Sequence, residues 1–144
     1  MSMNEELQEV LGGSSVFRRR LRSVDDMTLM IKQGLPFQSL LALSIRTQVD
    51  VNKMGRILMI PARTLARRRK ERRLTAAESD RLMRLARVFS RAIEVFGNSE
   101  KAAGWLNEPN RLLRNAAPID ILDTDIGVHS VETILGRIEY GVFS

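Results

Sequence analysis

The sequence has no cysteine and only one histidine, His129. Without cysteine it can form no disulfide, no thiolate nucleophile and no cysteine-ligated zinc or iron–sulfur site. One histidine excludes a metal site built from several imidazoles, and no serine or aspartate forms a catalytic motif with His129, so we interpret it as structural. The sequence also has no glycine-rich phosphate-binding loop. These absences argue against an enzyme with a bound metal or cofactor.

Long apolar runs are missing as well. The chain has 144 residues, of which 44% are hydrophobic and 28% charged, as in an ordinary globular domain. No apolar stretch approaches the roughly 18 residues that a membrane-spanning helix requires. Residues 1–11 are acidic and have no apolar signal region. We therefore expect a cytoplasmic protein that does not contact a membrane.

Charge is divided unevenly along the chain, which has a net charge of +6. Residues 46–91 carry 14 basic and 4 acidic side chains, net +10, whereas residues 92–144 carry 4 basic and 8 acidic, net −4. Residues 1–45 are neutral, with 5 of each sign. This asymmetry predicts two surfaces for two partners, one of them a polyanion. The alternative is that the basic side chains cover ordinary solvated helix faces.

Almost every segment has the pattern of a helix, and no run keeps the period of a strand. Residues 1–24 contain a Gly-Gly-Ser-Ser stretch at 12–15 and three arginines at 18–20, so we expect a flexible tail there. Capping residues, prolines and glycines place the helix ends. The predicted helices lie at about 25–33, 36–46, 51–59, 61–69, 75–96, 99–108 and 118–122. After a polar turn at 123–125, a last helix contains residues 131–138 and ends at Gly141.

Two short helices joined by a tight turn lie in the most basic part of the chain. Asp50 is a suitable N-cap for the first helix, and Pro61 is a suitable first residue for the second. Gly55 is expected to let another helix pack closely. Leu65 and Ala62 fall on the inner side of the second helix. The side chains on its outer side are Arg63, Thr64 and Arg67. This arrangement is typical of a DNA-binding helix-turn-helix.

The basic helix-turn-helix pattern predicts which side chains contact DNA. Arginine binds guanine edges through two hydrogen bonds and threonine contacts base edges or thymine methyl groups, so we predict base contacts from Arg63, Thr64 and Arg67. The predicted phosphate contacts are Lys53, Arg56, Arg68 and Lys70. RNA is a weaker candidate, because no aromatic side chain lies in the basic cluster to stack on a base.

A long helix is predicted to join the two halves of the protein. Thr75 and Glu78 form a capping box at its start, and the helix runs to about Phe96. Its apolar side chains share one face. The opposite face carries Arg81, Arg84, Arg87 and Arg91. We interpret this arginine stripe as a solvated face rather than a phosphate-binding site.

Several separate blocks of the sequence together resemble one family. In the basic half they are residues 60–69, 74–75 and 78–82. In the C-terminal half they are Phe96-Gly97, Trp105-Leu106, Pro109-Asn110, residues 118–122, Val131-Glu132 and Leu135-Gly136-Arg137-Ile138-Glu139. Over residues 34–144 the chain resembles the Xre/MbcA/ParS-type antitoxins. Met59 and Asn115-Ala116-Ala117 depart from the pattern, because those antitoxins often have glycine in these two turns.

The resemblance implies an all-α protein in which an N-terminal Xre-like helix-turn-helix half is joined by a long helix to a small helical C-terminal toxin-binding domain. We place the two parts at residues 25–90 and 91–144, after the tail at 1–24. The resemblance also implies an antitoxin of a type II toxin–antitoxin pair. Its partner would be a RES-domain toxin that degrades NAD. The chain would block the toxin's active site, form a homodimer within a larger complex, and repress its own operon by binding operator DNA.

In this interpretation the basic half faces DNA and the acidic half faces the toxin, so the chain itself is not an enzyme and needs no cofactor. We predict the toxin surface on the last helix and tail. Its candidate residues are Arg137, Glu139, Tyr140, Val142 and Phe143. Aromatic side chains at a chain end often anchor an interface. An equally good alternative is that the tail folds back on its own domain.

Two other functions stay open. The chain could be a stand-alone helix-turn-helix regulator whose C-terminal half only forms a dimer. Alternatively, the basic half could itself inhibit the toxin, which would make DNA binding incidental. A neighbouring RES-type gene would favour the antitoxin over the first alternative, and sequence-specific DNA binding would argue against the second.

Overall fold

The computed structural model describes residues 3–17 and 23–141 of the chain. Within these ranges the regular structure is helical and contains no strand, which confirms the predicted all-α fold. The α-helices are α1 (Met3–Val10), α2 (Val24–Gln33), α3 (Phe37–Thr47), α4 (Val51–Ile57), α5 (Ala62–Glu71), α6 (Ala76–Phe96), α7 (Ser99–Asn107) and α8 (Asp125–Glu139). Three 3-10 turns are η1 (Gly13–Ser15), η2 (Arg111–Leu113) and η3 (Pro118–Ile121).

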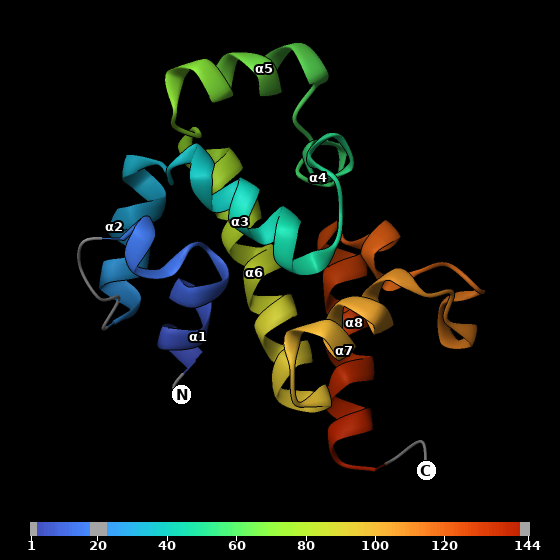
Figure 1. Cartoon of the computed structure of the whole chain (residues 1–144). Coiled ribbons are helices and arrows are strands. Elements are labelled where there is room, and N and C mark those ends of the chain that lie inside the picture. The colour runs from blue at the N-terminus through green and yellow to red at the C-terminus, as the bar shows by residue number, and fades with distance from the viewer. Residues whose placement is uncertain (1–2, 18–22, 142–144) are drawn as a thin grey trace.

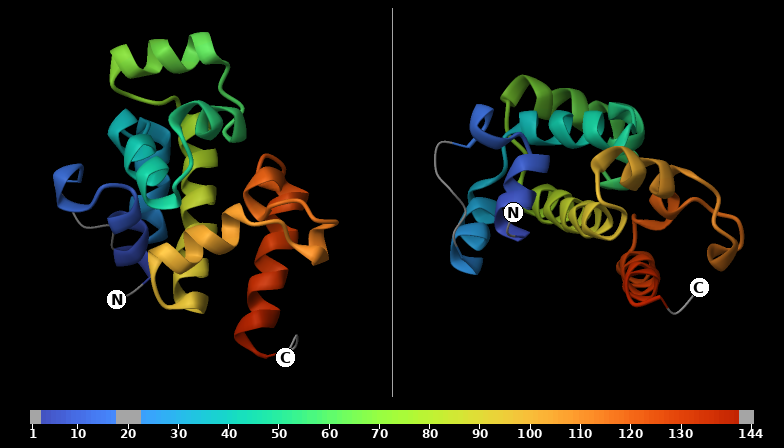
Figure 2. Two further views of the ribbon diagram at one scale, coloured as in Figure 1. Left: turned by 45° about the vertical axis from the view of Figure 1, so that its right-hand side comes forward. Right: turned by 60° about the horizontal axis from the view of Figure 1, so that its bottom comes forward.

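Helix α6 is the centre of the molecule (Figure 1). It begins with the predicted capping box at Thr75 and Glu78 and ends at Gly97, whose φ is 96°. Helices α1 and α2 pack on one side of it and α7 and α8 on the other, while α5 lies across its upper end (Figures 1 and 2). Leu82 and Phe89 are fully buried as predicted, but Met83 and Val88 are buried too. Neighbours on several sides therefore make α6 a core helix, not only a connection between two halves.

The N-terminal segment differs from the expected flexible tail. Residues 3–17 form α1 and η1, and Leu7, Val10 and Leu11 are fully buried against α3 and α6. Arg46 of α3 also lies 3.5 Å from Glu9. Burial of three large aliphatic side chains fixes this segment on the core. The three arginines at 18–20 lie outside the described residues.

Side-chain caps set most helix starts, and the predicted boundaries agree with the structure to within a few residues. The Asp50, Asn98 and Thr124 side chains each accept a hydrogen bond from the first turn of the helix that follows. Because Thr124 is the cap, Asp125 belongs to α8 and not to a preceding turn. Gly127, in the first turn of α8, packs against η3, and a Cβ added there would collide with the Ile121 carbonyl oxygen.

The described residues include no helix that is both long and apolar enough to cross a membrane. In the same ranges, no group of three or more histidine, cysteine or acidic residues is placed to hold a metal ion.

Candidate DNA-binding helix and partner-binding surface

Helices α4 and α5 form a closely packed pair, as expected for a helix-turn-helix. The Asp50 carboxylate accepts a hydrogen bond of 2.8 Å from the Lys53 backbone N–H, which starts α4. Leu65 is the buried residue of α5, and its Cδ2 atom lies 2.8 Å from where a Cβ would stand on Gly55. A side chain at position 55 would therefore force the Leu65 side chain, which packs α5 on α4, to move. The predicted reason for Gly55 is confirmed.

The turn between α4 and α5 contains a strained residue. Met59 has a φ of 60°, a left-handed conformation that costs an L-residue energy and that glycine adopts freely. Its side chain is 61% exposed and so gains little from burial. The turn still closes, because the Ile60 N–H donates a 2.8 Å hydrogen bond to the Gly55 carbonyl oxygen. The positive φ explains why glycine suits this position, and the closed turn shows that the position also accepts methionine.

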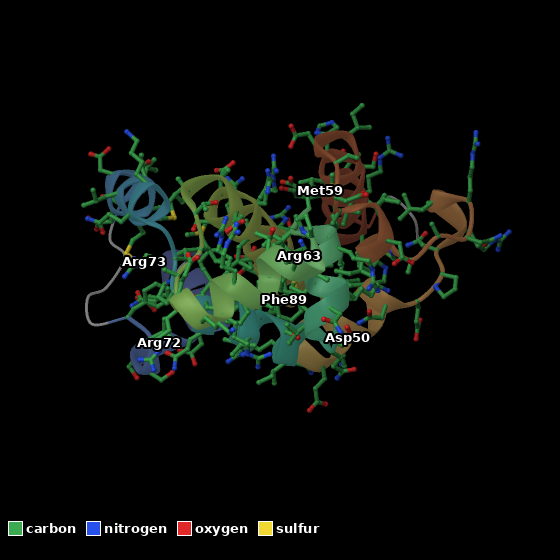
Figure 3. All side chains as sticks on the ribbon, turned by 90° about the horizontal axis from the view of Figure 1, so that it is seen from above. Asp50, Met59, Arg63, Arg72, Arg73 and Phe89 are labelled. Atoms are coloured by element: carbon green, nitrogen blue, oxygen red, sulfur yellow. The ribbon has the colours of Figure 1, made fainter. Side chains whose placement is uncertain are left out.

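Helix α5 lies at one end of the molecule and presents its outer face to solvent (Figures 1 and 3). Arg63 and Arg67 are exposed on that face, and Thr64 between them is half-buried. Arg67 also lies 3.6 Å from Glu71, one turn later. Ala62 shares a cavity with Leu65 and the start of α4, on the predicted inner side of α5, but it stays exposed there. The structure therefore brings the three predicted base-contacting residues onto one accessible face.

Arg68 is not placed as a surface phosphate contact. Its Nε donates a 2.7 Å hydrogen bond to Glu78 Oε1, and the two side chains are only 13% and 9% exposed. Burial alone raises the pKa of the Glu78 carboxyl. The hydrogen bonds from Arg68 and from the Thr75 backbone N–H outweigh this effect and hold that pKa below its usual value. Arg68 therefore fixes the end of α5 to the start of α6.

Other members of the basic run also have structural partners. The Arg69 guanidinium lies 5.8 Å from the centre of the Phe37 ring, a cation–π contact. Arg73 donates a 2.7 Å hydrogen bond to the Gly34 carbonyl oxygen. Lys70 and Arg72 are exposed at the end of α5 opposite Arg63 (Figure 3). The run thus alternates between side chains that hold the fold and side chains that remain available to a polyanion.

The predicted phosphate contacts on α4 divide in the same way. Arg56 is exposed and forms no ion pair within the described residues. Lys53 Nζ lies 2.9 Å from Oδ1 of Asp120, which belongs to η3 in the C-terminal half. The phosphate candidates that the structure leaves accessible without an ion pair in the described chain are therefore Arg56 and Lys70.

The arginine stripe of α6 is not a purely solvated face. Arg84 forms an ion pair with Asp125, and Arg91 lies 3.0 Å from Glu139, so both contact α8. Arg81 instead donates a 3.0 Å hydrogen bond to the Leu58 carbonyl oxygen at the end of α4. Exposed ion pairs of this kind contribute little stability singly, but they orient α8 along α6 (Figure 2). The predicted solvated face was therefore wrong for these three residues.

The predicted toxin-binding residues differ in how exposed they are to solvent. Tyr140 is 79% exposed at the end of α8, and Arg137 is exposed one turn earlier. Glu139 is held by Arg91. Val142 and Phe143 lie outside the described residues. Tyr140 and Arg137 are thus the candidates that the structure leaves accessible.

The C-terminal half also has a groove that sequence reasoning missed. It has a volume of about 470 Å³ and runs between η2 and α8. Its lining residues are Asn110, Arg111, Leu112, Ile134 and Ile138. Leu112 is 55% exposed and forms part of the apolar lining of this groove. Ile134 is buried and Ile138 half-buried, and the groove that they line depends on the position of η2 beside α8.

Comparison with known proteins gives matches over both halves. A model of the antitoxin Xre-like helix-turn-helix domain matches residues 26–87, and a model of the antitoxin Xre/MbcA/ParS C-terminal toxin-binding domain matches residues 91–141. A protein named Antitoxin Xre from Yersinia enterocolitica is 34% identical over 116 residues, which cover 79% of this chain and 78% of that protein. Two further proteins with this name, from Photorhabdus laumondii and Pseudomonas putida, are 32% and 39% identical, over 82% and 58% of this chain and 81% and 53% of their own lengths.

Proposed function

Because the chain belongs to the Xre antitoxin family, we propose that it is the antitoxin of a type II toxin–antitoxin pair. It neutralises a RES-type, NAD-degrading toxin by covering the toxin's active site, and it represses its own operon. The observation that carries this proposal is the presence of two accessible surfaces of different chemistry at separate places. One is the arginine-bearing outer face of α5, and the other is the apolar groove and Tyr140 beside α8.

The outer face of α5 supports operator binding. Arg63 and Arg67 can reach base edges in the major groove, where a helix of this diameter fits, with Thr64 between them. Arg56 and Lys70 are accessible for phosphate contacts on either side. A dimer would present two such faces to two half-sites one helical turn apart. We propose residues 25–90 as the DNA-binding part on this basis.

The surface around α8 supports toxin binding. Leu112 is an exposed side chain that lines the groove, and Tyr140 is exposed at the end of α8. Buried aromatic and aliphatic anchors often carry much of the binding energy of a protein interface. Arg111 lines the groove together with Leu112. We propose residues 91–144 as the toxin-binding part, with any NAD chemistry belonging to the toxin.

Co-expression with the product of the adjacent gene tests the toxin side of the proposal. A RES-type neighbour should arrest growth alone, be rescued by this chain, and co-purify with it. The Tyr140→Ala variant should weaken both rescue and co-purification, whereas Leu29→Ala, an exposed aliphatic residue on α2, should change neither. Failure of the wild-type chain to bind or rescue would overturn the proposal and leave the stand-alone regulator.

Titration of upstream DNA at several salt concentrations tests the DNA side. A repressor should bind its own upstream duplex tightly, prefer it over a random duplex, and show a steep fall of affinity with salt. A shallow salt slope with no sequence preference would contradict repression and favour a basic half that serves only the toxin.

A further inference from the structure

A cleft of about 380 Å³ separates α4 from η3, and charges of opposite sign face each other across it. Lys53 and Arg56 line it from the helix-turn-helix, and Asp120 and Asp123 line it from the C-terminal half. The Lys53 ammonium and the Asp120 carboxylate are 2.9 Å apart and both partly exposed to solvent. The Asp120 carboxylate of the acidic half thus forms an ion pair with the Lys53 ammonium of the basic half.

The position of Lys53 gives this contact a consequence for DNA. Lys53 lies in the first turn of α4, the helix of the pair that crosses the DNA backbone in helix-turn-helix complexes. A phosphate that approaches this turn meets a lysine already neutralised by Asp120. It also meets the negative charge of Asp123, which no ion pair within the described residues compensates. Both effects oppose phosphate binding at α4.

We propose that Asp120 is an intramolecular competitor of DNA phosphate, which holds Lys53 and lowers the affinity of the helix-turn-helix for DNA. The inference rests on the proposed DNA-binding function of α4 and α5. In this arrangement the C-terminal half weakens DNA binding through a direct ion pair. A change that withdraws Asp120 from Lys53 therefore strengthens binding without altering α5.

The other ion pairs between the two halves serve as internal comparisons. Arg84 with Asp125 and Arg91 with Glu139 also join a base of α6 to an acid of α8. They contact α6 rather than α4, so their loss removes a similar charge without releasing a cation of α4 or α5. Asp125→Asn is therefore a matched control for Asp120→Asn.

The test measures binding of the full chain to a fluorescent duplex from the region upstream of its own gene, and to a random duplex, between low and physiological salt. Asp120→Asn should bind both duplexes about two- to fivefold more tightly than wild type, the range expected when an exposed ion pair is removed. The slope of log K against log[salt] should steepen by about 0.9, as for one added phosphate contact. Asp125→Asn should change neither quantity measurably.

The double variant Lys53→Ala/Asp120→Asn separates release of Lys53 from a general charge effect. It should bind as Lys53→Ala does, because Asp120 acts through Lys53. Circular dichroism confirms that each variant is folded, which is expected because both residues are partly exposed. An Asp120→Asn affinity and slope equal to wild type, or a gain that persists without Lys53, would overturn the inference. Absence of DNA binding by the wild type and every variant would overturn the proposed function as well.

Discussion

The arginines of α5 and those of α6 look alike in sequence, but their side chains have different partners. On α5, Arg63 and Arg67 are exposed at the end of the molecule, and the ion pair of Arg67 is with Glu71 of the same helix. On α6, Arg84 and Arg91 are paired with acidic residues of α8. Part of the negative charge of the C-terminal half is therefore neutralised by arginines of α6, and is not available to a partner. The net charge of a region therefore identifies a binding surface only after the charges that are paired within the protein are left out of the count.

The largest expected effect comes from the ion pair of Arg68 with Glu78, which joins α5 to α6. Glu78→Ala leaves the poorly exposed Arg68 without its carboxylate and removes half of the α6 capping box. Loss of one partner of such a pair should lower the free energy of unfolding by about 2–3 kcal/mol. Urea unfolding monitored by circular dichroism measures it. Glu71→Ala, which removes a weaker and exposed partner of Arg68, is the control and should cost less than about 1 kcal/mol.

DNA binding tests directly whether the arginines of α5, but not those of α6, contact bases. Arg63→Ala or Arg67→Ala should each weaken binding to the upstream duplex by about 1–3 kcal/mol and reduce its preference over a random duplex. Arg84→Ala should leave that preference unchanged, because Arg84 is engaged with Asp125. Fluorescence anisotropy titrations provide the measurement. An equal loss of sequence preference for Arg84→Ala would show that the distinction between the two helices is wrong.

Acid should weaken the connection between α5 and α6. The folded state holds the pKa of Glu78 below its usual value of 4.5, so the ionised carboxylate contributes stability above that pH. This contribution is lost as pH falls from about 4.5 through the lower pKa of the folded state. Thermal unfolding between pH 7 and pH 3 should show a decline in Tm that is smaller in Glu78→Gln. The same decline in both proteins would assign the acid sensitivity to other carboxyl groups.

The smallest expected effect concerns the turn that places α5. Met59→Gly should stabilise the protein by about 0.5 kcal/mol, because relief of the left-handed strain slightly exceeds the entropic cost of glycine. Chemical denaturation measures the difference. Met59→Ala keeps the strained Cβ and should give no such gain, so equal stabilisation by alanine would point to the exposed side chain rather than to the backbone.

Local sequence signals predicted much of the fold. Asp50 and Thr75 marked helix starts because a capping side chain acts on the backbone within three residues of itself. The N-terminal helix was missed because α1 is short and is fixed by distant contacts of Leu7 and Leu11 with α3 and α6. A helix of eight residues has little stability alone, so its existence depends on packing that periodicity does not reveal.

The candidate sites divide in the same way. Helical spacing correctly grouped Arg63 and Arg67 on the outer face of α5, because both belong to one helix. It could not tell that Arg68 meets Glu78, or that Lys53 meets Asp120, since each pair joins separate elements. The groove at Leu112 depends on how η2 lies beside α8, which is likewise a tertiary property.

The contact between Gly127 and the Ile121 carbonyl oxygen sets a limit on inherited variation at this position. Every amino-acid replacement reached by changing one base of a glycine codon introduces a Cβ, and alanine is the smallest of them. Each would move the first turn of α8 away from η3, and with it the Ile134 side of the groove and the Asp125 end of the ion pair with Arg84. A library of random point variants selected for function should therefore retain glycine at position 127 while tolerating alanine at Gly104 and Gly136, where an added methyl group meets open space.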